Sequence, residues 1–293
     1  MSIASTESGQ VSLSGLDELW FQVAGTRCNL TCTHCFISCS PHNDSFGFLS
    51  MEVVRKSLAE SVEWGVREYY FTGGEPFLNP DLIEMLELCL SRQFKVLVLT
   101  NAMKPMMRYC APLMSLRQRY ANALNLRVSL DHYTKSLHEM ERGKRSWEPA
   151  LRGLRWLCSN GFRVQVAGRL GHSEAEPSVR RGYAALFQRE KLGIDAGDGN
   201  QLVLFPEMDD DADVPEITEA CWATLGISPD QVMCAKARMV VKRKDASKPT
   251  VVPCTLLAED PQFDLGFSLA GSSHQVTLNH PHCASFCLSL IHI

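Results

Sequence analysis

The sequence predicts an α/β fold built on a parallel sheet. Six apolar runs of β type alternate with helical stretches from residue 19 to about residue 225, and strands that alternate with helices pair in parallel. After residue 225 this alternation gives way to short β-like pieces, which predicts a small β-rich appendage. The six runs are LWFQVAG, REYYFTGG, KVLVLTN, LNLRVSLD, FRVQVAGRL and QLVLFPEM.

Residues that begin and end helices lie between these runs. Ser50 is a suitable N-cap for a helix over 51–64, and Gly65 stands just beyond its end. Asn79 followed by Pro80, at a first helical position, predicts a helix over 80–92.

A third helix, over 147–160, is predicted to end at Gly161. In βα units of this kind the reactive groups gather at the carboxyl ends of the strands. Functional residues are therefore expected directly after each strand.

Composition limits the classes of partner. The 293-residue chain is 45% hydrophobic and 21% charged with a formal net charge of −4, so no overall field favours nucleic acid or an anionic membrane. The N-terminus lacks a signal-peptide pattern, and no apolar run is long enough to span a membrane. We expect a cytoplasmic protein that binds neither.

Twelve cysteines are many for a chain in a reducing compartment. Cys89, Cys110 and Cys158 stand alone in predicted helices and are expected to be small buried hydrophobic residues. The other nine form an early and a late group, and clustering of this kind indicates metal binding.

The early group contains CNLTCTHC, which spaces Cys28, Cys32 and Cys35 directly after the first strand. Three thiolates on one loop can bind three irons of a four-iron, four-sulfur (4Fe-4S) cluster and leave the fourth iron open. Zinc is the alternative, and it requires a fourth ligand from His34, Cys39 or His42.

The second predicted strand ends in FTGGEP, in which two glycines allow a close backbone approach to a ligand. With CNLTCTHC before it, the chain resembles the radical S-adenosylmethionine (radical SAM) superfamily. The resemblance implies a partial (β/α)6 barrel, like a half-open TIM barrel, over 19–225 and a cluster whose open iron binds S-adenosylmethionine. The positions that match the superfamily's cofactor contacts are Gly73, Gly74, Glu75, His34, Thr100, Ser129 and Arg169.

This resemblance also implies the chemistry. Reductive cleavage of S-adenosylmethionine at the 4Fe-4S cluster gives a 5′-deoxyadenosyl radical that abstracts hydrogen from the substrate. An external electron donor such as flavodoxin or ferredoxin would reduce the cluster. Because a net oxidation also releases a proton, Asp131 and His132 are candidate bases after the fourth strand, with Tyr133, Glu207 and Asp209 as further candidates.

The late cysteines occupy a segment, 226–287, that resembles the twitch domain, a shortened SPASM domain. Cys234, Cys254, Cys283 and Cys287 could bind all four irons of an auxiliary 4Fe-4S cluster. Two departures weaken the assignment of each thiol to an iron: Pro249 stands where a glycine is usual, and the last pair is spaced by three residues. Zinc, unliganded thiols and an extra ligand at Cys221 stay open.

We therefore predict a radical SAM enzyme that acts on a small metabolite or a short peptide, with the auxiliary cluster as electron acceptor. The alternatives are a redox-neutral rearrangement like that of the molybdenum-cofactor cyclase, or a zinc-stabilised binding protein. The extension over 1–18 is too short for a leader-peptide domain, which tilts the expectation toward a metabolite or a peptide delivered by a partner.

The final residues 288–293, LSLIHI, match one reading frame of a sequencing-transposon end, CTGTCTCTTATACACATCT. They are expected to be a non-native tail, and the natural chain is expected to continue past Cys287.

Overall fold

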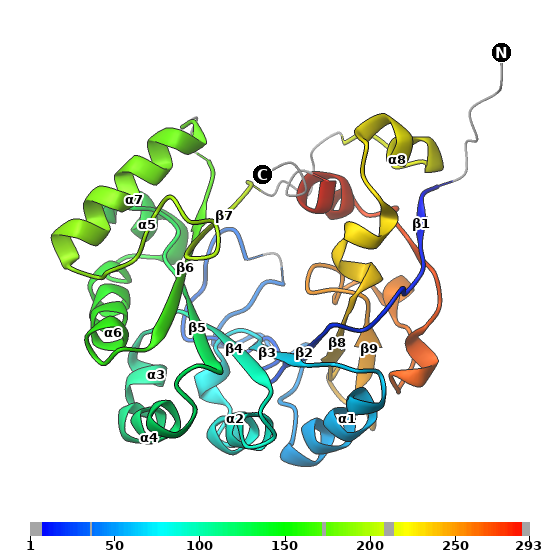
Figure 1. Ribbon diagram of the computed structural model, residues 1–293, viewed down its shortest axis with the longest axis horizontal. Coiled ribbons are helices and arrows are strands. Elements are labelled where there is room, and N and C mark those ends of the chain that lie inside the picture. Colours follow the sequence, from blue (N-terminus) through cyan, green and yellow to red (C-terminus); the bar gives the residue numbers. More distant parts are fainter. Residues whose placement is uncertain (1–7, 36, 172–173, 208–213, 289–293) are drawn as a thin grey trace.

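A computed structural model describes residues 8–35, 37–171, 174–207 and 214–288. Eight strands form one curved sheet in the order β7-β6-β5-β4-β3-β2-β8-β9, with the larger helices on its outer side (Figure 1). The strands are β2 (Glu18–Gln22), β3 (Glu68–Thr72), β4 (Lys95–Thr100), β5 (Leu124–Ser129), β6 (Arg163–Arg169), β7 (Leu202–Phe205), β8 (Ala237–Val241) and β9 (Thr250–Val252).

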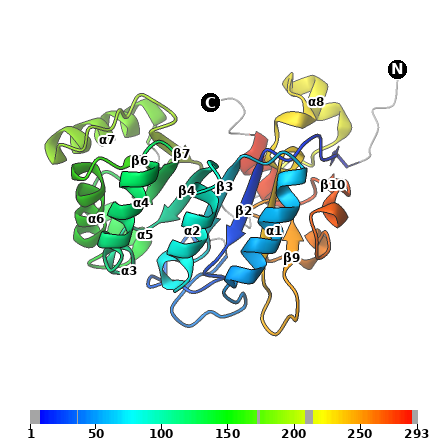
Figure 2. The same cartoon turned by 60° about the horizontal axis from the view of Figure 1, so that its bottom comes forward.

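Every neighbouring pair from β2 to β7 is parallel, so the predicted α/β fold with a parallel sheet is confirmed. β8 also pairs in parallel, with β2, and β9 then turns back antiparallel to β8. The C-terminal hairpin therefore extends the barrel sheet, whose end strands are β7 and β9. Figure 2 shows β9, in orange, on the opposite side of the molecule from β6 and β7.

The helices follow the predicted pattern. They are α1 (Met51–Glu63), α2 (Leu82–Leu90), α3 (Lys104–Met107), α4 (Cys110–Tyr120), α5 (Lys135–Arg142), α6 (Trp147–Ser159), α7 (Glu176–Glu190) and α8 (Glu219–Leu225). Ser50 caps α1 as predicted, because its Oγ accepts a hydrogen bond from the Val53 amide at 3.4 Å.

Helix α2 begins at Leu82, two residues later than predicted. The Asn79 side chain holds the preceding turn: its Oδ1 accepts from the Asp81 amide at 2.9 Å, and its Nδ2 donates to the Val23 and Leu49 carbonyls. A turn of 3₁₀ helix, Pro76–Leu78, precedes it. Asn79 thus starts the helix by shaping the turn before it.

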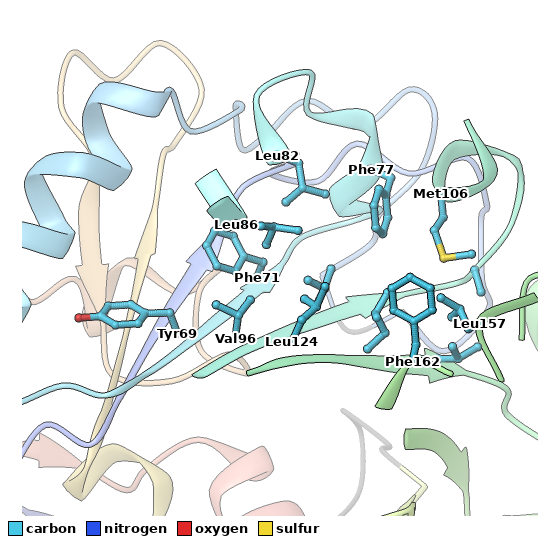
Figure 3. Close-up of a cluster of buried hydrophobic side chains, with 14 of the residues drawn as sticks. Tyr69, Phe71, Phe77, Leu82, Leu86, Val96, Met106, Leu124, Leu157 and Phe162 are labelled. Atoms are coloured by element: carbon cyan, nitrogen blue, oxygen red, sulfur yellow. The ribbon is translucent and has the colours of Figure 1, made fainter. Parts of the chain in front are cut away.

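The main core lies between the outer face of the sheet and the helices (Figure 3). Phe71 lies beside Leu86 of α2, and Tyr69, two residues earlier on the same face of β3, hydrogen-bonds Ser61 of α1 at 2.9 Å. Because successive strand residues point to opposite faces, Tyr70 and Thr72 face the inside of the barrel. The sheet's inner face is therefore free to build a site.

The segments that flank the barrel meet each other. β1 (Gln10–Val11) pairs antiparallel with β10 (Val276–Thr277), and Val11 and Val276 share a second core with the late cysteines. Residues 1–7, and all of the predicted tail except Leu288, lie outside the described residues. No helix in the described part of the chain is long and apolar enough to cross a membrane.

Candidate active site

A cavity of about 360 Å³ lies on the inner side of the sheet. Its lining residues come from the loops and carboxyl ends of the strands and from the C-terminal region. This is the place where parallel α/β sheets bind ligands.

Cys28, Cys32 and Cys35 all line this cavity, on the loop after β2. Burial raises the pKa of Cys28 to about 12. The pKa of Cys35 falls to about 6, chiefly because the Cys39 thiol donates a hydrogen bond to it. Cys39, a candidate zinc ligand, also donates its amide to the Cys35 sulfur at 3.2 Å.

These thiols suit a cluster. Among the described residues no three His, Cys, Asp or Glu side chains converge on a single metal ion. A 4Fe-4S cluster presents a separate iron to each thiolate, so its ligands need to share a cavity wall and do not need to converge on one point.

The Gly73-Gly74-Glu75 segment packs on the cysteine loop. Gly73 has φ +132°, and a Cβ on Gly74 would lie 2.1 Å from the Arg27 carbonyl oxygen. The Gly74 and Glu75 amides donate to the Gly25 and Arg27 carbonyls, both at 2.9 Å. The segment after β3 thereby fixes the backbone beside Cys28.

Gly73 and Gly74 line the cavity, whereas Glu75 is fully buried behind it. The Glu75 carboxylate accepts hydrogen bonds from Thr100 Oγ1 at 2.8 Å and from the Asn101 amide at 2.9 Å. Burial raises the pKa of Glu75 to about 7. In this arrangement Glu75 positions Thr100 and Asn101, which do line the cavity.

Ser129, Asp131 and His34 line the wall beyond Asn101. Arg142 binds Asp131 through two nitrogens, with Nε–Oδ2 at 2.5 Å and Nη2–Oδ1 at 3.0 Å. His34 Nε2 lies 3.3 Å from Asp131, and its Nδ1 lies 2.9 Å from Glu141.

This network sets the charge of Asp131. Burial acts to raise the pKa of Asp131, but the Arg142 guanidinium and His34 outweigh it, so the pKa lies below its usual range. Asp131 is therefore a carboxylate that holds Arg142 beside the cysteine loop. Nothing local in the sequence distinguishes Arg142 from the other surface-like arginines of its segment, so sequence reasoning missed it.

Arg169 lines the cavity and makes no side-chain hydrogen bond to any described residue. Burial lowers the pKa of Arg169, so a ligand carboxylate would be a favourable partner. His132 does not line the cavity and instead contacts Thr134 and Glu174, at 2.9 and 3.0 Å. Tyr133 also binds Glu174, and Asp209 lies outside the described residues.

The four late cysteines come together in one buried group. Cys254 interacts electrostatically with Cys287, Cys234 and Cys283, and burial raises the pKa of Cys234 and of Cys287 to about 12. Cys221 packs against the same core, and its sulfur takes part in the N-terminal cap of α8 with Thr218.

Arg238 lies next to these thiols and is fully buried. It donates to the carbonyls of Ser272, Cys234 and Ala237, but its Nη2 has no partner and no carboxylate pairs with it among the described residues. The titratable groups that face it are the Cys234 and Cys254 thiols. A buried cation without an acid requires a nearby anion, and a thiolate-bound cluster fits that requirement.

Fold and site together define a radical SAM enzyme. Residues 23–178, more than half of the chain, match the radical SAM superfamily, and the chain belongs to it. The superfamily resemblance predicted from the two motifs is thus confirmed.

Three relatives illustrate the likeness. AlbA, a subtilosin biosynthesis protein of Bacillus subtilis, is 32% identical over 142 residues, which are 48% of this chain and 30% of AlbA. Mycofactocin maturase MftC of Mycobacterium tuberculosis is 29% identical over 135 residues, 46% of this chain and 33% of MftC. SuiB of Streptococcus suis, bound to its precursor peptide SuiA, has a TM-score of 0.63 at 13% identity, over 90% of this chain and 66% of SuiB.

The match thus spans about a third of the length of each curated relative. The likeness to SuiB shows a common fold.

Proposed function

We propose that this enzyme oxidises a peptide held between two iron–sulfur clusters. The observation that carries the proposal is that one cavity is lined both by the early cysteines and by sequence neighbours of the late ones. Cys28, Cys32 and Cys35 line this cavity, and its lining also includes Met233, Thr255, Leu256 and Phe286, each within two residues of a late cysteine in the sequence.

Cys28, Cys32 and Cys35 would hold the first cluster, and Arg142 would balance its negative charge. Gly73 and Gly74 would allow S-adenosylmethionine to approach the backbone, with Thr100, Ser129, His34 and Arg169 along its length. When bound, this cofactor pair supplies hydrogen abstraction from an unactivated carbon. The chain's own task is to position that carbon and to exclude water.

Cys234, Cys254, Cys283 and Cys287 would hold an auxiliary 4Fe-4S cluster, with Arg238 as its counter-charge. Four thiolates leave no iron open, so the cluster would accept an electron from the substrate. A flavodoxin or ferredoxin would reduce the first cluster.

A net oxidation also releases a proton. Of the two candidate bases, Asp131 borders the cavity and His132 does not, so between them Asp131 is the one placed to receive the proton directly. Its two-point contact with Arg142 lowers its pKa and makes it a weak base. We therefore assign Asp131 a positioning role.

Two relatives favour a peptide over a metabolite. SuiB is seen with a precursor peptide, and AlbA takes part in bacteriocin biosynthesis. In the redox-neutral alternative, the product would have the mass of the substrate, whereas the oxidised product is lighter by two hydrogens.

The test is anaerobic incubation of the reconstituted enzyme with S-adenosylmethionine and reductant. We expect 5′-deoxyadenosine to form. Triple replacement of Cys28, Cys32 and Cys35 by alanine should abolish it, while Cys110→Ala, a helical cysteine outside both groups, should not change it. The absence of 5′-deoxyadenosine from the wild-type reaction would refute the proposal.

A further inference from the structure

A second layer of side chains lies deeper in the barrel than Ser129. Gln22 pairs in register with Thr72, and Leu99 with Arg127. Because Phe71 pairs with Val98, Thr72 lies beside Leu99, and the four residues form one level across β2 to β5. All four line the cavity. Because Arg127 precedes Ser129 by two residues, it lies about 7 Å further from the cysteine loop.

Arg127 has unused hydrogen-bond donors in this layer. Its Nε donates to Gln165 Oε1 at 2.9 Å, and its two Nη groups make no hydrogen bond or ion pair with any described residue. A guanidinium binds a carboxylate through two parallel hydrogen bonds, which Arg127 can still form.

The acids and phenols near Arg127 are already engaged. Glu18 accepts from Trp20 Nε1 at 3.1 Å and from the Tyr70 hydroxyl at 3.3 Å. Burial lowers the pKa of Arg127, with Tyr70 and Glu18 as the groups that oppose this effect. Its charge is therefore only partly compensated within the protein.

Gln22 is the second polar group without a partner in this layer. Its side chain is 1% exposed, and neither Oε1 nor Nε2 forms a hydrogen bond within the described structure. A buried side-chain amide whose nitrogen has no acceptor and whose oxygen has no donor destabilises the folded protein, unless a ligand supplies both partners. A peptide group supplies one of each.

The remaining lining here is largely apolar: Leu99 lies in this layer, and Trp20, paired in register with Met239, lies two residues deeper. Gln22 and Arg127 are three strands apart, about 14 Å along the sheet, so a short stretch of substrate fits between them.

We propose that Arg127 binds a carboxylate of the substrate, while Gln22 pairs with a peptide group beside it. The inference rests on the proposed function, since it specifies the peptide residue presented in the barrel: an acidic side chain or a C-terminal carboxylate.

The test is a calorimetric measurement of how tightly three tripeptides, each blocked at the N-terminus, bind to the anaerobically reconstituted enzyme loaded with S-adenosylmethionine. The first has a central glutamate and an amidated end, the second a central glutamine and an amidated end, and the third only alanines and a free C-terminal carboxylate. At least one carboxylate peptide should bind about 10- to 100-fold more tightly than the glutamine peptide, because a hydrogen bond between charged groups is lost.

Arg127→Gln should reduce this preference to within about twofold, and Arg127→Lys should retain part of it, because the charge remains but the two-point geometry is lost. Gln22→Leu should weaken all peptides without changing the preference. The matched control is Arg163→Gln, which removes an exposed arginine of the neighbouring strand and should change nothing. Iron content and circular dichroism check that each variant is folded.

Equal binding of all three peptides, no binding of any, or an unchanged preference in Arg127→Gln would overturn the inference. So would a loss of S-adenosylmethionine affinity in Arg127→Gln equal to the loss of peptide affinity, because Arg127 would then bind the cofactor's carboxylate. The ratio of carboxylate-peptide to glutamine-peptide affinity is measured without turnover. The carboxylate preference can therefore be absent while 5′-deoxyadenosine still forms, and it can be present when no 5′-deoxyadenosine forms, so the two proposals fail separately.

Discussion

Gly74→Ala should separate the two loops that build the cofactor site. The added Cβ would lie 2.1 Å from the Arg27 carbonyl oxygen and 2.9 Å from the Cys28 Cβ. Real Cβ atoms do not approach closer than 3.0 Å, so the backbone next to Cys28 must move by about 0.9 Å. Both neighbours are part of the chain near its first cluster ligand, so no flexible side chain can absorb the shift.

A displacement of about 1 Å in a positioning group can reduce the rate about 100-fold. We therefore expect 5′-deoxyadenosine formation to fall by about that factor, with weaker binding of S-adenosylmethionine. The assay is liquid chromatography of the anaerobic reaction together with iron analysis.

The matched control is Gly199→Ala, where a Cβ meets nothing within 4 Å and φ is not positive. It should behave as wild type. If Gly74→Ala keeps the wild-type rate and cofactor affinity, the GGEP segment does not set the position of the cysteine loop.

Two further changes test the charged groups. Arg142→Gln removes the two-point partner of the buried Asp131 carboxylate, leaves it only His34, and should lower the free energy of unfolding in urea by about 3 to 5 kcal/mol, against about 0.5 kcal/mol or less for exposed Arg145→Gln. Burial acts to raise the pKa of Asp131, and Arg142 outweighs it in the wild type, so the wild-type pKa lies below its usual range, whereas burial should raise the pKa of Asp131 in Arg142→Gln. The difference in stability between the two proteins should therefore be largest at neutral pH and narrow as the pH falls and Asp131 of the variant takes up a proton. Arg238→Met removes the cation beside Cys234 and should lower the midpoint potential of the auxiliary cluster by about 60 mV in a titration followed by electron paramagnetic resonance, a tenfold change in a one-electron equilibrium. An unchanged potential would show that Arg238 does not balance the cluster's charge.

The strands and the first cysteine group could be predicted because both are local patterns. Apolar runs of period two and helix caps such as Ser50 act within a few residues, and three thiols on one loop need no long-range information. The GGEP segment was found by its place after a strand. The start of α2 was misjudged because Asn79 is held by two carbonyls from distant segments.

The charge pairing of the site could not be predicted in this way. Arg142 is assigned by its contact with Asp131, and Arg127 by the lack of partners for its Nη groups. Both are properties of the folded barrel. The parallel pairing of β8 with β2 likewise joins segments more than 200 residues apart, so the sequence predicted the strand but not its neighbour.

Iron and sulfide analysis of two sets of cysteine variants tests the central claim most directly. Wild-type enzyme reconstituted anaerobically should hold about eight irons and eight sulfides, two clusters of four. Replacement of Cys28, Cys32 and Cys35 by alanine, or of Cys234, Cys254, Cys283 and Cys287, should each leave about four of both. About four irons or fewer without sulfide in the wild type, or loss of all iron from either variant set, would contradict two clusters facing one cavity.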